Sequence, residues 1–211
     1  GDDAAVLDCG AEDYLLYTTD MLIEGMHFLR TVMSPQEIGR KALACSISDI
    51  AAMGGIPTFA VVSTGAPTNT ARSFLEGIDE GFNALAKEYH VSLVGGDMTR
   101  SNRLVINVAL LGKVGKQDVI YRAGAKKGDS IFVTGALGNS FKNRKHIHFT
   151  PRVKEAQFLI RHARPHAMID VSDGLAGDLG HILKQSGVGA VIRGEQVPLA
   201  KDATLEQALH D

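Results

Sequence analysis

Three apolar runs typical of buried strands are each followed closely by an aspartate. The runs are Tyr14–Thr19, Val91–Val94 and Ala167–Ile169, and the aspartates are Asp20, Asp97 and Asp170. Carboxylates at strand ends can converge on one edge of a sheet. Oxygen ligands gathered in this way suit Mg²⁺, which usually keeps several waters and completes its octahedron with substrate phosphates. The pattern therefore points to a fold that presents carboxylates for metal-assisted phosphate chemistry.

Two further acidic motifs extend this hypothesis. Asp49 lies among the otherwise small and apolar residues of Ala42–Ala52, where an aspartate is costly unless it is paired or binds a cation. The alternative is a partly exposed aspartate near a helix end, where the helix dipole would disfavour it. Gly1-Asp2-Asp3 is a weaker signal, because Gly-Asp pairs usually mark turns.

Strands and helices alternate in the first half of the chain. Ser34 as N-cap, Pro35 at the first helical position and Glu37 closing a capping box predict a helix that runs to about Met53. Thr70 can cap a second helix, whose apolar residues keep helical spacing. Strands are expected at Tyr14–Thr19, Thr58–Thr64, Val91–Val94 and Leu104–Leu111. This order predicts an α/β or α+β domain.

A second domain is expected after a polar, Gly/Lys-rich stretch. We place the boundary near Lys116, which gives domains at residues 1–116 and 117–211. The second would be another α/β unit, with strands at Ser130–Thr134, Ala167–Val171 and Val188–Ile192 and helices at Pro151–His162 and Leu175–Gln185. The polar segment between Gly138 and Pro151 indicates a flexible loop or missing residues.

Composition excludes several classes of function. The 211 residues are 45% hydrophobic and 22% charged, which is typical of a globular protein. A net charge of -2 gives no basic footprint for nucleic acid, and no apolar run is long enough to cross a membrane. Cys9 and Cys45 form no disulfide framework, which predicts a reducing, cytoplasmic location. Walker A, Rossmann, G-x-S-x-G and H-E-x-x-H motifs are absent from the sequence.

The motifs, in this order, resemble those of thiamine-monophosphate kinases. The matching stretches are Gly1–Val6, Thr18–Phe28, Ser46–Pro57, Leu93–Arg100, Arg122–Asp129 and Ala167–Asp178. Ser48–Gly54 is shared with the wider superfamily of aminoimidazole ribonucleotide synthetase, selenophosphate synthetase and the hydrogenase maturation dehydratase. Thr19-Asp20 through Phe28 resembles the kinase's own version of the shared strand.

The resemblance implies transfer of the γ-phosphoryl group of ATP to thiamine monophosphate, giving thiamine diphosphate and ADP. It implies a homodimer formed through the N-terminal sheet, with ATP in the groove between the two domains. No covalent catalytic residue is expected, because a phosphate-monoester oxygen is already anionic near neutral pH. Two phosphorylated substrates and clustered aspartates can share one cleft only if several Mg²⁺ ions separate their charges.

The same resemblance implies the site residues. Mg²⁺ would be held by Asp3, Thr18, Thr19, Asp20, Asp49, Asp97 and Asp170, with Asp173 holding a further ion. ATP would contact Gly96, Arg122 and Ser172, and thiamine phosphate would contact His27. From the residues alone, Asp173 could instead be a helix N-cap, His27 a structural histidine and Gly95-Gly96-Asp97 a tight turn.

Alternatives remain within and outside the superfamily. Other members activate an amide or carbonyl oxygen with ATP, and a non-catalytic nucleotide-binding module would keep the metal site without turnover. The chain begins at Gly1 within a motif, and the family has a longer segment after Gly135 and continues beyond Asp211. We therefore expect the full protein to extend past both ends of this sequence.

Overall fold

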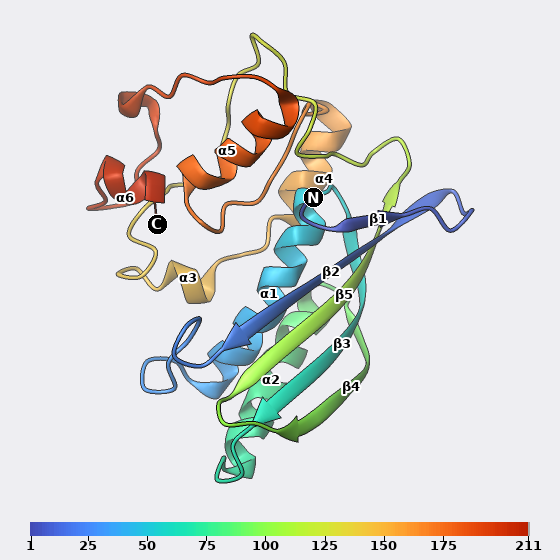
Figure 1. Ribbon diagram of the computed structural model, residues 1–211, viewed down its shortest axis with the longest axis vertical. Helices are drawn as coiled ribbons and strands as arrows, with labels where there is room; N and C mark the ends of the chain where they lie inside the picture. Colours follow the sequence, from blue (N-terminus) through green and yellow to red (C-terminus); the bar gives the residue numbers. More distant parts are fainter. Residues whose placement is uncertain (211) are drawn as a thin grey trace.

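The computed structural model describes residues 1–210, and its N-terminal half is built on one five-stranded sheet. The strand order is β1-β2-β5-β3-β4, and β3 pairs with β4 in parallel while the other neighbours are antiparallel. The strands are β1 (Ala5–Leu7), β2 (Asp13–Ile23), β3 (Ile56–Ala66), β4 (Ser92–Arg100) and β5 (Val105–Gly115). Figure 1 shows β1 and β4 at opposite edges of this sheet.

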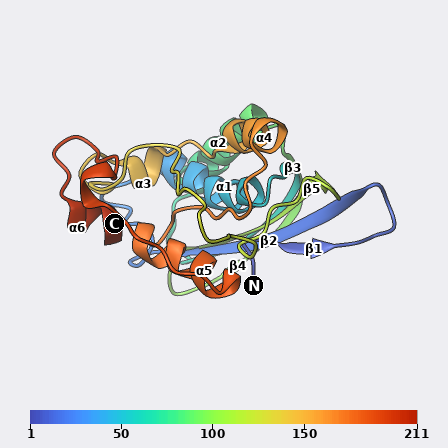
Figure 2. The ribbon, with the colours of Figure 1, turned by 90° about the horizontal axis from the view of Figure 1, so that it is seen from above.

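Helices α1 (Pro35–Ala52) and α2 (Arg72–Glu88) lie together on one side of the sheet (Figure 2). The start of α1 is confirmed. The Ser34 hydroxyl accepts a hydrogen bond from the Glu37 backbone N–H at 3.2 Å, and the Glu37 carboxylate accepts one from the Ser34 N–H at 2.8 Å. The predicted Thr70 cap is wrong, because Ala71 is the N-cap residue of α2 and no side chain caps it. Thr70 therefore stands one position too early to reach the first turn.

The two faces of the sheet differ in what covers them. Alternate residues of β2 and β5, such as Leu16 and Val108, are fully buried in a core formed with α1 and α2. On the opposite face, Tyr17, Met21, Phe59 and Val61 remain 42–53% exposed. We call these four residues the open face, and nothing in residues 1–210 packs over it.

The remainder of the described chain is helical and irregular. It contains α3 (Lys145–His148), α4 (Val153–His162), α5 (Leu175–Ser186), the short 3₁₀ helix η1 (Gly194–Gln196) and α6 (Leu205–His210). Helix α4 docks on the end of α1, where the Gln157 side-chain amide donates to the Gly54 carbonyl at 2.7 Å. No helix within residues 1–210 is both long and apolar enough to cross a membrane.

The α/β class is confirmed, but the strands predicted after the boundary are wrong. Ser130–Thr134, Ala167–Val171 and Val188–Ile192 form no strand in the described structure. A strand requires a neighbour to receive its backbone hydrogen bonds, and these segments do not pair with one another. Phe132 and Val191 are consequently 88% and 85% exposed.

Candidate metal and nucleotide site

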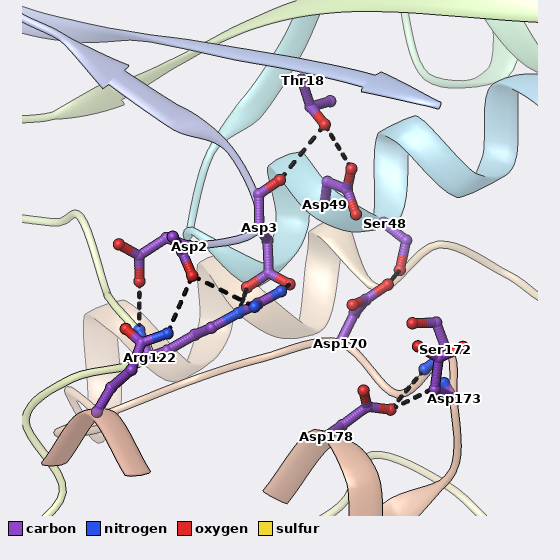
Figure 3. A network of polar contacts seen from close by, with 12 residues as sticks. Asp2, Asp3, Thr18, Ser48, Asp49, Arg122, Asp170, Ser172, Asp173 and Asp178 are labelled. Atoms are coloured by element: carbon purple, nitrogen blue, oxygen red, sulfur yellow. Dashed lines mark hydrogen bonds and ion pairs between the residues drawn. The ribbon is translucent and has the colours of Figure 1, made fainter. Parts of the chain in front are cut away.

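Three carboxylates from distant parts of the chain converge beside β1 and the middle of β2. Asp3 precedes β1, Asp49 belongs to the last turns of α1, and Asp170 lies in the segment that leads to α5. One oxygen of each lies within 4.8 Å of the others (Figure 3). Such a set of hard oxygen atoms could hold a divalent cation. We call these three residues the acidic cluster.

Hydroxyl groups hold the cluster's carboxylates in place. Thr18 on β2 donates to Asp49 Oδ2 at 2.5 Å, and Ser48 donates to Asp170 Oδ2 at 2.8 Å. Sequence reasoning missed Ser48, although its position beside Asp49 on a small, apolar helix face was a usable signal. These neutral hydroxyls position Asp49 and Asp170 and leave the charge of these two carboxylates uncompensated.

Burial makes the charged form of these carboxylates costly. Burial raises the pKa of Asp49 to about 8, and the negative charges of Asp20, Asp170 and Asp3 add to that shift. Burial likewise raises the pKa of Asp170 to about 7, despite the hydrogen bond from Ser48. A bound cation would reverse this preference, because it stabilises the ionised carboxylates.

Asp20 lies next to the cluster on the same face of β2 as Thr18. Its Oδ2 accepts a hydrogen bond from the Ser46 hydroxyl at 2.8 Å, and burial raises its pKa. Asp20 stands inside β2, so the expectation that it follows the end of a strand is wrong. The apolar alternation continues through Leu22, which extends the strand beyond the predicted end at Thr19.

Arg122 connects the cluster to the first residues of the chain. Its guanidinium pairs with Asp3, with Nη2 at 2.6 Å from Oδ1 and Nε at 3.3 Å from Oδ2. Its backbone N–H donates to Asp2 Oδ1 at 2.9 Å. The residue predicted to contact ATP therefore borders the carboxylates predicted to hold metal.

The turn before α5 carries Ser172 and Asp173 beside Asp170 (Figure 3). Both backbone N–H groups donate to Asp178 Oδ2, at 2.8 and 3.0 Å. Gly174 is the N-cap residue of α5, so the alternative in which Asp173 caps that helix is wrong. Sequence reasoning missed the buried Asp178, because its role depends on a backbone turn rather than on a motif.

The structure does not bring Thr19 or Asp97 to the cluster within one chain. Side chains alternate along a strand, so the Thr19 hydroxyl lies on the opposite face from Thr18 and donates to Asn107 Oδ1 at 3.1 Å. Asp97 pairs in register with Ser63, and β5 and β3 separate its strand from β2.

Gly96 also lies far from the cluster, and its position has a structural reason. A Cβ atom at Gly96 would lie 2.3 Å from the Val62 carbonyl oxygen, so glycine permits the close approach of β4 to β3. Strand β4 runs on to Arg100, and the prediction that it ends at Val94, with a tight turn as the alternative for Gly95-Gly96-Asp97, is wrong.

His27 lies in the loop that follows β2. Its Nδ1 accepts a hydrogen bond from the Ile23 backbone N–H at 3.0 Å. Nδ1 must then carry a lone pair, so the proton is on Nε2 and the exposed side of the ring is a hydrogen-bond donor. Its carbonyl oxygen accepts from the Lys41 ammonium at 3.1 Å.

Comparison with known proteins identifies the family. Residues 1–114 match the family described as AIR synthase related protein, N-terminal domain. The chain is 37% identical to a thiamine-monophosphate kinase of Bacillus subtilis, over 96% of this chain and 69% of that protein. The chain belongs to the thiamine-monophosphate kinase family. A homologue of the same name from Buchnera aphidicola subsp. Schizaphis graminum is 35% identical over 97% of this chain and 68% of its own length.

Solved structures agree with this family. A structure described as AaThiL complexed with AMPPCP and TMP has a TM-score of 0.92 and 31% identity, over 99% of this chain and 75% of that chain. The thiamine monophosphate kinase of Aquifex aeolicus has a TM-score of 0.90 and 30% identity, over 99% and 78%. A HypE–HypF complex, at a TM-score of 0.82 and 22% identity, shares the fold.

Proposed function

We propose that this chain transfers the γ-phosphoryl group of ATP to thiamine monophosphate, producing thiamine diphosphate and ADP. The acidic cluster carries this proposal, because the fold gathers half-buried carboxylates where the family resemblance expects metal-bound phosphates. Membership of the kinase family and the likeness to a structure holding AMPPCP and TMP support the same substrates.

The acidic cluster fits Mg²⁺. Mg²⁺ binds oxygen at about 2.1 Å, so opposite ligands of one ion lie roughly 4.2 Å apart. The cluster's oxygen atoms lie within 4.8 Å of one another, which is close to this span, so small side-chain movements would let the three carboxylates share one ion. We propose that Asp3, Asp49 and Asp170 hold Mg²⁺, with Thr18 and Asp20 beside them. Bound Mg²⁺ would neutralise the charge on the phosphates and on the transferred group.

The chain's own residues then orient the two substrates. Asp3 fixes the Arg122 guanidinium at the edge of the cluster through Nε and Nη2, and the remaining N–H donors of the guanidinium suit an ATP phosphate. Ser172 and Asp173 lie on a turn that Asp178 holds rigid, and we propose that they contact ATP and a further Mg²⁺. His27 presents its Nε2–H to the acceptor. No side chain needs to act as nucleophile, because positioning and charge neutralisation carry most of phosphoryl transfer.

Turnover of ATP with and without thiamine monophosphate tests this function. We expect ADP and thiamine diphosphate to form together, only when both substrates and Mg²⁺ are present, and excess chelator to stop the reaction. ADP formation that does not depend on thiamine monophosphate would favour another ATP-using enzyme of the superfamily. Binding of ATP without any turnover would favour a regulatory module.

We also propose a homodimer whose subunits meet through the open face. Its aromatic and aliphatic side chains are exposed on the side of the sheet that α1 and α2 leave uncovered. Exposed apolar patches of this kind usually mark an interface. Asp97 is in register with Ser63, on the same side of the sheet as Thr19, so both residues would face a partner subunit and could contribute to its site.

Phe59→Asp should dissociate this dimer. A carboxylate buried in an apolar interface lacks a partner, so we expect the dissociation constant to rise by about 100-fold or more. Sedimentation velocity across micromolar concentrations would measure the change. Phe158→Asp is the matched control, because Phe158 is 60% exposed on α4, away from the sheet. A wild-type chain that sediments as a stable monomer would contradict the proposal.

We propose two domains, residues 1–116 and 117–211, because the chain leaves the sheet at Gly115.

We also propose a reducing, cytoplasmic location, which is supported by the free thiols of Cys9 and Cys45.

A further inference from the structure

Strand β2 and helix α1 face each other along a line of polar contacts. Thr18 bonds Asp49, Asp20 bonds Ser46, and the loop after β2 bonds Lys41 through the His27 carbonyl. Each step towards the C-terminal end of β2 therefore meets a residue closer to the N-terminus of α1. The acidic cluster lies at one end of this line, and Lys41 lies at the other.

Helix geometry places Lys41 on the same side of α1 as the cluster. Lys41 and Asp49 are two i, i+4 steps apart, with Cys45 between them, so the three side chains share one face. At about 1.5 Å per residue, roughly 12 Å of helix separates Lys41 from Asp49. The Lys41 ammonium donates to the His27 carbonyl, at the end of the line away from Asp49, so a ligand that contacts both ends must lie along the length between them.

The Lys41 ammonium lacks a counter-charge within residues 1–210. It is partly buried, its one hydrogen bond there goes to the His27 carbonyl, and no carboxylate pairs with it. Burial lowers the pKa of this ammonium. An ammonium has three donors, and a partly buried cation that lacks an anion is suited to bind one.

The loop beside Lys41 is held rigid. The Glu24 carboxylate accepts hydrogen bonds from Nε and Nη2 of Arg30, both at 2.6 Å. The Leu104 backbone N–H also donates to Glu24 Oε2, at 3.2 Å. Phe28 is buried, and His27 is fixed as the Nε2–H tautomer. The loop and helix therefore carry two hydrogen-bond donors, His27 Nε2–H and the Lys41 ammonium, on residues that are joined by the bond from the ammonium to the His27 carbonyl.

We propose that Lys41 binds the phosphate group of thiamine monophosphate beside His27. This inference rests on the proposed kinase function, and it divides the site into a metal-binding end for ATP and a cationic end for the acceptor. Lys41 would offset part of the negative charge on the acceptor phosphate and help to hold it in line with the cluster. It would also help to select the phosphorylated vitamin over thiamine itself.

Three substitutions separate this role from a structural one. Lys41→Gln keeps a donor for the His27 carbonyl but removes the charge, and Lys41→Arg keeps both. Lys87→Gln is the control, because Lys87 is an exposed lysine on α2. The KM for thiamine monophosphate at saturating ATP, the KM for ATP, and calorimetric binding of thiamine monophosphate without ATP would be measured for each variant.

We expect Lys41→Gln to weaken binding of thiamine monophosphate by about 10-fold or more, as loss of a charged hydrogen bond does. Lys41→Arg should stay within about 3-fold of wild type, and the KM for ATP should stay within about 2-fold for every variant. Thiamine monophosphate binding that is unchanged in Lys41→Gln, or equal losses in the Gln and Arg variants, would overturn the inference. A wild-type chain that binds no thiamine monophosphate would overturn the proposed function itself, before any variant is compared.

Discussion

Asp49→Asn should remove almost all kinase activity and, without divalent metal, should raise the melting temperature of the chain. The amide keeps an oxygen that can accept the Thr18 hydrogen bond, so the local geometry changes little. It cannot supply the negative charge that holds a cation. We expect kcat to fall by about 10² to 10³-fold, as loss of electrostatic stabilisation does in other enzymes.

The gain in stability follows from the pKa of the same group. The Asp49 pKa is raised from 3.8 to about 8 in the folded chain. A carboxyl group whose pKa is raised by folding contributes stability that is fully present below its pKa in the unfolded chain. That stability is lost as the pH rises through its pKa in the folded chain. The free energy of unfolding of the metal-free chain should therefore fall between about pH 4 and pH 8. Asn at position 49 does not titrate and removes this part of the decline.

Thermal unfolding at pH 8 would measure both the gain in stability without metal and the loss of Mg²⁺ binding. With chelator, the Asn variant should melt above wild type. With increasing Mg²⁺, wild type should gain stability because the ion binds only the folded chain, and the variant should gain little. Asp79→Asn, at an exposed position on α2, is the control and should respond to Mg²⁺ as wild type does. Equal Mg²⁺ responses in Asp49→Asn and wild type would show that the cluster does not bind the ion.

Local signals predicted the N-terminal elements well. Ser34, Pro35 and Glu37 define the start of α1 through contacts within one turn, and the structure has all of them. The segments predicted as strands after Gly115 lack such local control. Their pairing depends on partners elsewhere, and apolar composition alone does not supply one.

The acidic residues converge for a different reason from the one the sequence suggested. Strand ends do not gather them, since Asp20 lies within β2 and Asp49 lies on a helix. Helix α1 packs against β2, and the N-terminal segment and the turn before α5 reach the same place. Thr18 and Thr19 show the limit of motif reasoning, because adjacent strand residues face opposite sides of a sheet.

Ser46 and Ser48 illustrate what a motif cannot reveal. They hold Asp20 and Asp170, which lie 26 and 122 residues away along the chain. A hydroxyl on an apolar helix face gains this role only when the facing element is in place. Long-range contacts of this kind require the packing of the whole fold, so they cannot be predicted from sequence periodicity.

That packing depends on the crossing of α1 and α2, where Gly39→Ala and Gly81→Ala should each be severely destabilising. A Cβ atom at Gly39 would lie 1.9 Å from the Ile78 carbonyl oxygen, and one at Gly81 would lie 1.9 Å from the Gln36 carbonyl oxygen. Both obstacles are backbone atoms, which cannot rotate aside as a side chain can. The helices would have to separate, and their buried contacts would be lost along the whole interface.

We expect each substitution to lower the free energy of unfolding by about 3 kcal/mol or more, at the upper end for an overpacked core. Gly177→Ala is the matched control, because Gly177 lies within α5 and a Cβ atom there meets nothing within 4 Å. It should raise stability by roughly 0.5–1 kcal/mol through helix propensity alone. Urea unfolding would measure all three, and a Gly81→Ala variant as stable as wild type would contradict the close crossing. Because α1 carries Asp49, a shift of this helix should also weaken the Mg²⁺ response, linking the helix crossing to the proposed metal site.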